Sequence, residues 1–157
     1  MGGRNTDLKT AIYRYCNYQE RCQQEVRNKL YELKASTPEV ENLIAELIEA
    51  GLLNEERFAR AVARGKFRMM HWGKGKIVQL LKQHRISEYC IKKALTEIDY
   101  DEYLATLSRL AARKWEEFRS DKSLQQRKSK VYRYLAGKGY ESALIAEALA
   151  PLTGGKA

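Results

Sequence analysis

Apolar residues recur at intervals of three and four along nearly the whole chain, and very little interrupts them. Such stripes occupy residues 8–15, 40–48, 58–62, 77–81 and 104–111. This spacing places apolar side chains on one face of a helix. Only two prolines occur in 157 residues, although proline usually makes up roughly 5% of a domain. No segment alternates apolar and polar residues as a strand does, so the pattern predicts an all-α fold.

Capping and breaking residues divide this pattern into separate helices. Thr37 followed by Pro38 is typical of a helix start, with proline at the first helical position, and Gly51 is expected to end that helix. Asn54 is expected to cap the next helix, whose first turn is acidic. Further breaks are expected at residues 71–75, 87 and 137–139.

The chain also repeats itself. A shift of 51 residues aligns Val26 with Ile77, and a further shift of 54 aligns Ile77 with Val131. The same offsets hold through two helices and the turn between them. Because a unit of about 50 residues buries only a limited core, we expect the repeats to pack edge to edge into an elongated array, straight or curved. The three predicted three-helix repeats are residues 6–51, 54–98 and 99–152.

The positive charge is concentrated in one stretch. The chain has 29 basic and 20 acidic residues, a net charge of +9, and residues 57–93 contain 11 of the basic residues but a single acid. Either this stretch is a solvated helix face, or it focuses a field on which a polyanion or an acidic protein docks. The scarcity of interleaved acids favours docking. The candidate contact residues are Arg57, Arg60, Arg64, Lys66, Arg68, Lys74, Lys76, Lys82 and Arg85.

Five of these residues are expected to make the main contacts. Arg57, Arg60 and Arg64 are spaced at three and four, which places them along one helical stripe. Lys74 and Lys76 alternate with Gly73 and Gly75, which let a backbone approach a partner closely. Arg57 has a second interpretation, because it also suits a structural salt bridge with Glu55 or Glu56.

Aromatic residues near these charges allow two interpretations. Trp72 either stacks on a partner or plugs the junction between two helices, and we expect the plug. Three tyrosines crowd residues 13–18, so one of them is expected to be exposed. A lesser basic cluster at Arg127, Lys128, Lys130 and Arg133 has Tyr132 and Tyr134 between its members, although aromatics at helical spacing usually belong to the core.

Catalytic and metal chemistry find little support in the sequence. Cys16, Cys22 and Cys90 form no CxxC pair, which predicts a reduced cytoplasmic protein without a disulfide framework or a zinc site. His71 and His84 have no obvious orienting acid, and no phosphate-cradling glycine loop is present. No apolar run approaches the roughly 20 residues of a membrane span. We expect a monomeric non-enzyme without cofactor, metal or small-molecule substrate.

Residues 51–61 read Gly-Leu-Leu-Asn-Glu-Glu-Arg-Phe-Ala-Arg-Ala, and Trp-Gly-Lys-Gly-Lys-Ile follows at 72–77 and Leu-Leu-Lys-Gln-His-Arg-Ile at 80–86. This stretch resembles the middle unit of the RecX family, which is also helical and built of three units. Residues 135–140 match the third unit more loosely. Two departures concern turn geometry: Ala35 and Arg85 stand where the family usually has glycine after lysine.

The resemblance implies a regulator of the RecA recombinase, active in DNA repair, recombination and the SOS response. Members of the family bind the RecA–DNA filament along its groove and modulate strand exchange, ATP hydrolysis and co-protease activity, with inhibition as the expected direction. Two other hypotheses stay open. The chain could be a general helical DNA-binding module that acts without RecA, or a scaffold whose basic stretch docks an unrelated acidic partner.

Overall fold

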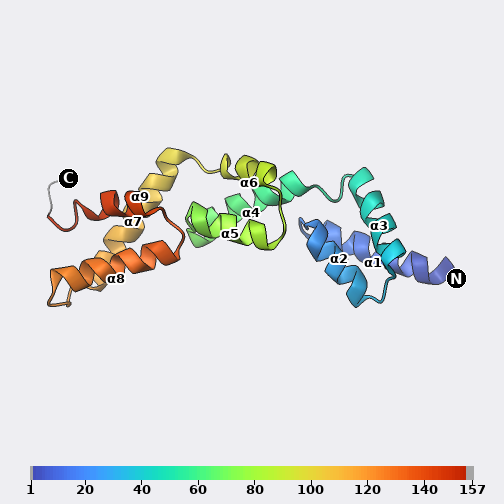
Figure 1. Ribbon diagram of the computed structural model, residues 1–157, viewed down its shortest axis with the longest axis horizontal. Helices are drawn as coiled ribbons and strands as arrows, with labels where there is room; N and C mark the ends of the chain where they lie inside the picture. Colours follow the sequence, from blue (N-terminus) through green and yellow to red (C-terminus); the bar gives the residue numbers. More distant parts are fainter. Residues whose placement is uncertain (1, 155–157) are drawn as a thin grey trace. The chain divides into compact units, whose positions relative to one another are not determined.

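The computed structural model describes residues 2–154, with side chains from residue 6 onward. Over this range the chain forms nine α-helices and no strand, which confirms the all-α prediction (Figure 1). None of these described helices has the length and apolarity that crossing a bilayer requires. The helices are α1 (Gly2–Tyr18), α2 (Gln23–Glu32), α3 (Thr37–Glu49), α4 (Glu55–Met70), α5 (Lys74–Gln83), α6 (Glu88–Leu95), α7 (Tyr100–Glu117), α8 (Leu124–Gly137) and α9 (Ser142–Leu149).

Side-chain caps fix the starts of α3 and α4. The Ser36 hydroxyl accepts a hydrogen bond from the Glu39 N–H at 3.4 Å, and the Glu39 carboxylate accepts one from the Ser36 N–H at 2.8 Å. The predicted cap at Thr37 is therefore wrong by one residue, because Ser36 and Glu39 stand at the spacing of a capping box. Asn54 caps α4 as predicted, accepting from the Arg57 N–H at 2.8 Å.

The same turn joins the second and third helices of each three-helix group: α2 to α3, α5 to α6, and α8 to α9. Lys34, Arg85 and Gly139 have φ values of 71°, 59° and 100°. Each is followed by an N–H that donates to the carbonyl five residues before it: Ala35 to Leu30 at 3.0 Å, Ile86 to Leu81 at 3.0 Å and Tyr140 to Leu135 at 3.2 Å. This is the Schellman arrangement, which usually places glycine at the left-handed position. The turn is thus kept although two of the three repeats lack that glycine. In the first repeat Lys34 occupies the left-handed position, and the expectation for Ala35 is wrong by one residue.

Burial follows the internal alignment. Val26, Ile77 and Val131 are all 0% exposed, and so are Leu30, Leu81 and Leu135. All six side chains are therefore fully buried. The offsets of 51 and 54 residues therefore identify equivalent core positions, as a repeated three-helix architecture requires.

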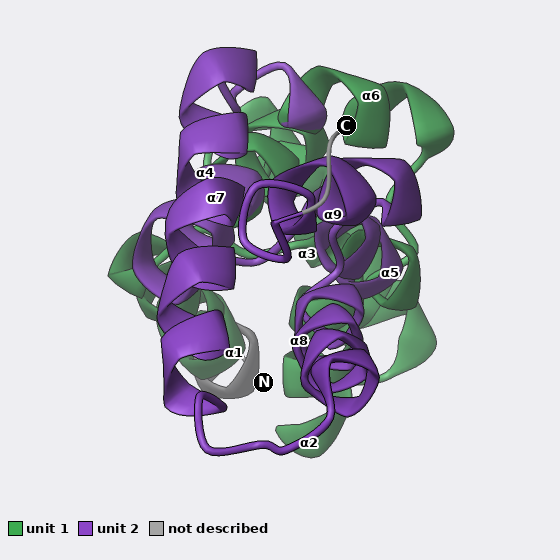
Figure 2. Cartoon of the chain, turned by 90° about the vertical axis from the view of Figure 1, so that its left-hand side faces the viewer, with its two compact units in different colours: residues 1–62, 81–94 green, residues 63–80, 95–157 purple. Residues whose placement is uncertain are grey.

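The contacts divide the chain into two compact units (Figure 2). Unit 1 comprises residues 1–62 and 81–94, and unit 2 comprises residues 63–80 and 95–157. In unit 1, α1, α2 and α3 enclose a core that includes Ile12, Leu30 and Leu47. In unit 2, α7, α8 and α9 pack on one another. The boundaries between the units fall within α4, α5 and α6, so the bounds of the three predicted repeats remain a prediction.

Unit 2 contains a junction made of backbone. The Gly73 N–H donates to the Lys138 carbonyl at 2.7 Å, and the Gly75 N–H donates to the Gly139 carbonyl at 2.8 Å. A Cβ atom on Gly73 would lie 2.3 Å from the Gly139 carbonyl carbon, which is far inside van der Waals contact. We expected these glycines to let a partner approach. The backbone that approaches them belongs to the same chain.

Two buried tyrosines seal this junction. The Tyr103 hydroxyl accepts from the Lys74 N–H at 2.8 Å and donates to the Glu141 carboxylate at 2.5 Å. The Tyr140 hydroxyl donates to the His71 carbonyl at 2.8 Å. Burial raises the pKa of Tyr103 and of Tyr140, and the hydrogen bond to Glu141 raises the pKa of Tyr103 further. Both phenols therefore stay protonated well into alkaline solution.

Candidate functional site

The three arginines of the predicted stripe each hold an acidic partner. The Arg60 guanidinium lies 3.0 Å from the Glu56 carboxylate within α4. Arg64 lies 2.8 Å from the carboxylate of Glu97, which follows α6. Ion pairs of this kind contribute little to stability, about 0 to 1 kcal/mol, yet each neutralises a charge that we expected to face a partner. The stripe is therefore a row of ion pairs.

Arg57 also has a structural role, although its partner differs from the prediction. Its guanidinium lies 2.7 Å from the Glu20 carboxylate and donates to the Gly51 carbonyl at 2.9 Å. The predicted partners, Glu55 and Glu56, are wrong. Glu55 accepts from the Ser87 hydroxyl, and Glu56 pairs with Arg60. Sequence spacing could not find Glu20, because it lies 37 residues away.

The indole ring of Trp72 holds lysines from two helices. The Lys66 ammonium lies 5.0 Å from the ring centroid and the Lys76 ammonium lies 4.4 Å from it. Trp72 is half-buried, so the predicted plug is only partly formed. Each such cation–π contact contributes about 0.5 to 1 kcal/mol at an exposed site, and it leaves the positive charge in place. Lys66, Trp72 and Lys76 together form what we call the Trp72 cluster.

Lys74 lies beside the Trp72 cluster and has a similar environment. Its ammonium lies 5.1 Å from the centroid of the Tyr103 ring, and its backbone N–H is held by the Tyr103 hydroxyl. Lys74 and Lys76 occupy the first turn of α5, so the break expected at residues 71–75 ends before Lys74. The positive end of the helix dipole lies at the start of α5. It adds to the positive potential of the two ammonium groups, and this potential attracts anions.

The remaining three candidates are exposed. Arg68 belongs to unit 2, and Lys82 and Arg85 belong to unit 1. Within residues 6–154, no acid lies at ion-pair distance from any of these three side chains. The nine candidates therefore divide into three ion-paired arginines, three lysines on aromatic rings and three exposed cations.

Unit 2 holds more of the positive charge than the sequence window suggested. It contains 16 basic and nine acidic residues, against 13 and 11 in unit 1. Part of this charge comes from the lesser basic cluster. Arg127 lies 3.9 Å from the centroid of the Trp115 ring and Lys130 lies 2.8 Å from Asp121, whereas Lys128 and Arg133 are exposed. A count along the sequence missed this distribution because the unit is discontinuous.

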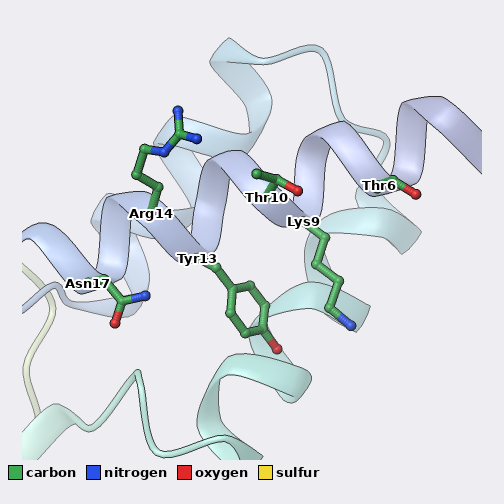
Figure 3. Close-up of a pocket in the computed structure, with 6 residues that line it drawn as sticks. All are labelled: Thr6, Lys9, Thr10, Tyr13, Arg14 and Asn17. Carbon is green, nitrogen blue, oxygen red and sulfur yellow. The ribbon is translucent and has the colours of Figure 1, made fainter.

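The N-terminal helix carries a shallow pocket of a different character. It is lined by Thr6, Lys9, Thr10, Tyr13, Arg14 and Asn17. Figure 3 shows Lys9 and Tyr13 leaning to the same side of α1 while Arg14 points away from them. The Lys9 ammonium lies 3.6 Å from the carboxylate of Glu46 on α3, so Lys9 forms an ion pair within unit 1. Of the three crowded tyrosines, Tyr18 is exposed, as expected.

The cysteine thiols are unsuited to nucleophilic chemistry. Cys16, Cys22 and Cys90 are all buried, and burial raises the pKa of each thiol. A raised pKa removes the thiolate that such chemistry needs. The structure does bring Cys22 together with Glu25 and His84, with their ligand atoms within 4.8 Å of one another. Spacing along the sequence missed this group because His84 is 62 residues from Cys22.

Known proteins match this chain over most of its length. Residues 54–95 match the family model described as RecX, second three-helix domain, and residues 101–149 match RecX, third three-helix domain. A Regulatory protein RecX from Halalkalibacterium halodurans is 33% identical over 137 residues, which cover 87% of this chain and 51% of the relative. A Regulatory protein RecX from Chlorobium phaeobacteroides is 29% identical over 148 residues, covering 92% and 95%.

The chain thus spans about half the length of the first relative and nearly all of the second. Among solved structures, the crystal structure of RecX from Lactobacillus salivarius has the same fold, with a TM-score of 0.85 at 22% identity over 97% of this chain and 98% of that one. The two family models together match more than half of the residues. On these matches and on its repeated three-helix fold, the chain belongs to the RecX family of regulatory proteins.

Proposed function

We propose that this chain binds the RecA–DNA filament and modulates the recombinase, ATPase and co-protease activities of RecA, with inhibition as the expected direction. The observation that carries the proposal is the set of cations in α4 and α5 that no described acid neutralises. A filament presents phosphates and acidic protein surface, and both attract such a set. In this proposal the chain acts in the cytoplasm as a monomer, without a cofactor.

The contacts of the nine candidates are not equivalent in this proposal. We assign phosphate or carboxylate contacts to Lys66, Arg68, Lys74 and Lys76 in unit 2, and to Lys82 and Arg85 in unit 1. An ion-paired arginine must first give up its carboxylate, and the gain in Coulomb energy is then largely offset. A lysine on an aromatic ring has no carboxylate to give up, because the ring leaves its positive charge unneutralised.

The test of function is a titration of the protein into RecA filaments assembled on single-stranded DNA, with ATP hydrolysis as the measurement. We expect suppression at amounts well below one regulator per RecA subunit if the chain blocks filament growth. Unchanged hydrolysis at equimolar amounts contradicts the proposal. Running the titration at two salt concentrations measures how much of the binding is electrostatic.

A matched pair of variants tests the assigned contacts. Lys66→Gln with Lys76→Gln removes two cations from the Trp72 cluster, and Arg60→Gln with Arg64→Gln removes two ion-paired cations. If lysines contact phosphates of single-stranded DNA, the first pair lowers the slope of log affinity against log salt by about 1.4, which is roughly 0.7 per contact. The second pair should leave this slope nearly unchanged. Equal losses from both pairs contradict the assignment.

Binding to DNA alone decides between this proposal and the general DNA-binding module. Tight and steeply salt-dependent binding to naked DNA, with no added affinity for the filament, favours the module. Weak binding to naked DNA combined with tight binding to the filament supports the RecA regulator. Tight binding to an acidic protein, with neither DNA nor filament bound, would favour the scaffold.

A further inference from the structure

Three side chains that bind transition metals well converge in unit 1. They are the Cys22 thiol, the Glu25 carboxylate and the His84 imidazole, and their ligand atoms lie within 4.8 Å of one another. The Cys22 sulfur is 3.5 Å from the Nδ1 atom of His84. Cys22 is buried, and the other two are half-buried. The role described so far for this chain uses none of the three.

The local fold holds these donors in place. Cys22 is the N-cap of α2, and the Glu25 carboxylate accepts a hydrogen bond from the Cys22 N–H at 3.0 Å. His84 lies in the turn after α5, where the edge-to-face contact with Phe58, at 5.4 Å between ring centroids, fixes its ring. The left-handed residue Arg85 follows directly and turns the chain away. The donors are therefore oriented by backbone and packing before any ion binds.

The spacing suits tetrahedral zinc. With Zn–S near 2.3 Å and Zn–N near 2.05 Å, a tetrahedral angle places sulfur and nitrogen about 3.5 Å apart. That is the distance between the Cys22 sulfur and the His84 nitrogen. A zinc-bound carboxylate oxygen lies about 3.5 Å from each of the other ligands. A separation of up to 4.8 Å therefore has to close by at most ~1.3 Å when Glu25 binds. Sulfur and nitrogen donors favour zinc over magnesium or calcium.

The charges also balance. One thiolate and one carboxylate offset the two positive charges of the ion, and the N-terminus of α2 favours both anions. Binding forms a zinc–sulfur bond and breaks the S–H bond of Cys22, whose proton passes to solvent. A cavity of about 200 Å³, lined by Gln23, Gln24, Arg27, Glu55, His84 and Arg85, opens beside His84. Because His84 lines this cavity, an ion or a water molecule can approach the cluster from the His84 side.

We propose that Cys22, Glu25 and His84 form a site for one zinc ion, with water as its fourth ligand. The site joins the start of α2 to the turn after α5 inside unit 1. It does not depend on the proposed action on RecA, so either proposal can fail without the other.

The test is a titration of the full chain with Co²⁺ under reducing conditions, followed by absorption spectroscopy. Cobalt occupies tetrahedral zinc sites and reports a cysteine ligand through a thiolate-to-cobalt charge-transfer band. We expect this band to saturate at one Co²⁺ per chain and to disappear on addition of Zn²⁺. Cys22→Ser should abolish the band, and His84→Gln should weaken binding by at least ~10-fold, the scale of losing a partner in a metal site.

Matched variants separate a ligand role from a structural one. Cys16→Ser removes another buried thiol of unit 1, and His71→Gln removes the other histidine, so both should leave the band unchanged. Glu25→Gln keeps an oxygen that caps Cys22 but loses the charge, so it should weaken binding while circular dichroism stays the same. No charge-transfer band in the unmodified chain overturns the proposal. A band that survives Cys22→Ser, or that Cys16→Ser also abolishes, overturns it too.

Discussion

Replacing Arg85 by glycine should stabilise the protein. Arg85 has a φ of 59° in a turn whose counterpart in the third repeat is Gly139. The two turns are closed by the same hydrogen bond, from Ile86 to Leu81 and from Tyr140 to Leu135. Arg85 is exposed, so its side chain contributes no core packing that the substitution would remove.

The size of the effect follows from two opposing costs. A residue with a Cβ atom pays about 1 to 2 kcal/mol to adopt the left-handed conformation, because the Cβ approaches the following carbonyl oxygen. Glycine avoids that cost but makes the unfolded chain more flexible, which costs about 0.4 to 1 kcal/mol. The difference predicts a gain of about 0.5 to 1 kcal/mol. For a chain of this size the melting temperature should rise by about 1 to 4 °C.

Urea unfolding followed by circular dichroism measures this gain. Arg85→Ala is the matched control, because it removes the same charge and keeps the Cβ atom. Arg85→Gly should therefore be more stable than both the unmodified chain and Arg85→Ala, and Lys34→Gly should show a gain in the same direction. If Arg85→Gly is no more stable than Arg85→Ala, the argument from backbone conformation is refuted.

The backbone junction and its tyrosines give two further predictions. Gly73→Ala should cost ~2 kcal/mol or more, because the new methyl group overlaps the backbone of Gly139. Gly65→Ala places its methyl group where nothing lies within 4 Å, so it should raise the free energy of unfolding in urea by ~1 kcal/mol. If the two substitutions change the free energy of unfolding equally, the packing argument is contradicted. Because burial raises the pKa of Tyr103, folding favours its protonated form. The contribution of Tyr103 to stability should be constant below about pH 10 and fall as pH rises above it, so Tyr103→Phe should reduce the alkaline loss of stability. An unchanged decline above about pH 10 would contradict this reasoning.

The fold was largely predictable because apolar core residues recur at the repeat offsets along the sequence. Val26, Ile77 and Val131 share an environment, and a period of three and four with so little proline leaves few alternatives to helices. The cap of α3 shifted by one residue because Ser36 and Thr37 are both good caps, and only the carboxylate of Glu39 decides between them. The spacing from Ser36 to Glu39 is itself the sequence signature of a capping box, so this cap was open to prediction.

The count of charges along the sequence selected the nine candidate cations, and their role in binding stays a prediction. The count could not show which of these cations are neutralised within the fold. It could not show that Glu20 and Glu97, both distant in the sequence, neutralise Arg57 and Arg64. Nor could it separate these arginines from Lys66 and Lys76, whose partner is an aromatic ring. Long-range pairing decides which charges remain for a partner, and it follows from tertiary structure.

The backbone junction of unit 2 has a consequence for how firmly a partner can be held. Two main-chain hydrogen bonds fix the start of α5 against the end of α8 with no flexible side chain between them. The backbone of α5, which carries Lys74 and Lys76, therefore keeps a constant separation from the backbone of α8, which carries Arg133. When a ligand contacts both helices, the protein loses no conformational entropy from fixing a hinge between them. The second contact therefore forms at little extra free-energy cost. The glycines that allow this close backbone contact therefore keep the spacing between α5 and α8, and with it the spacing of the charges that these helices carry.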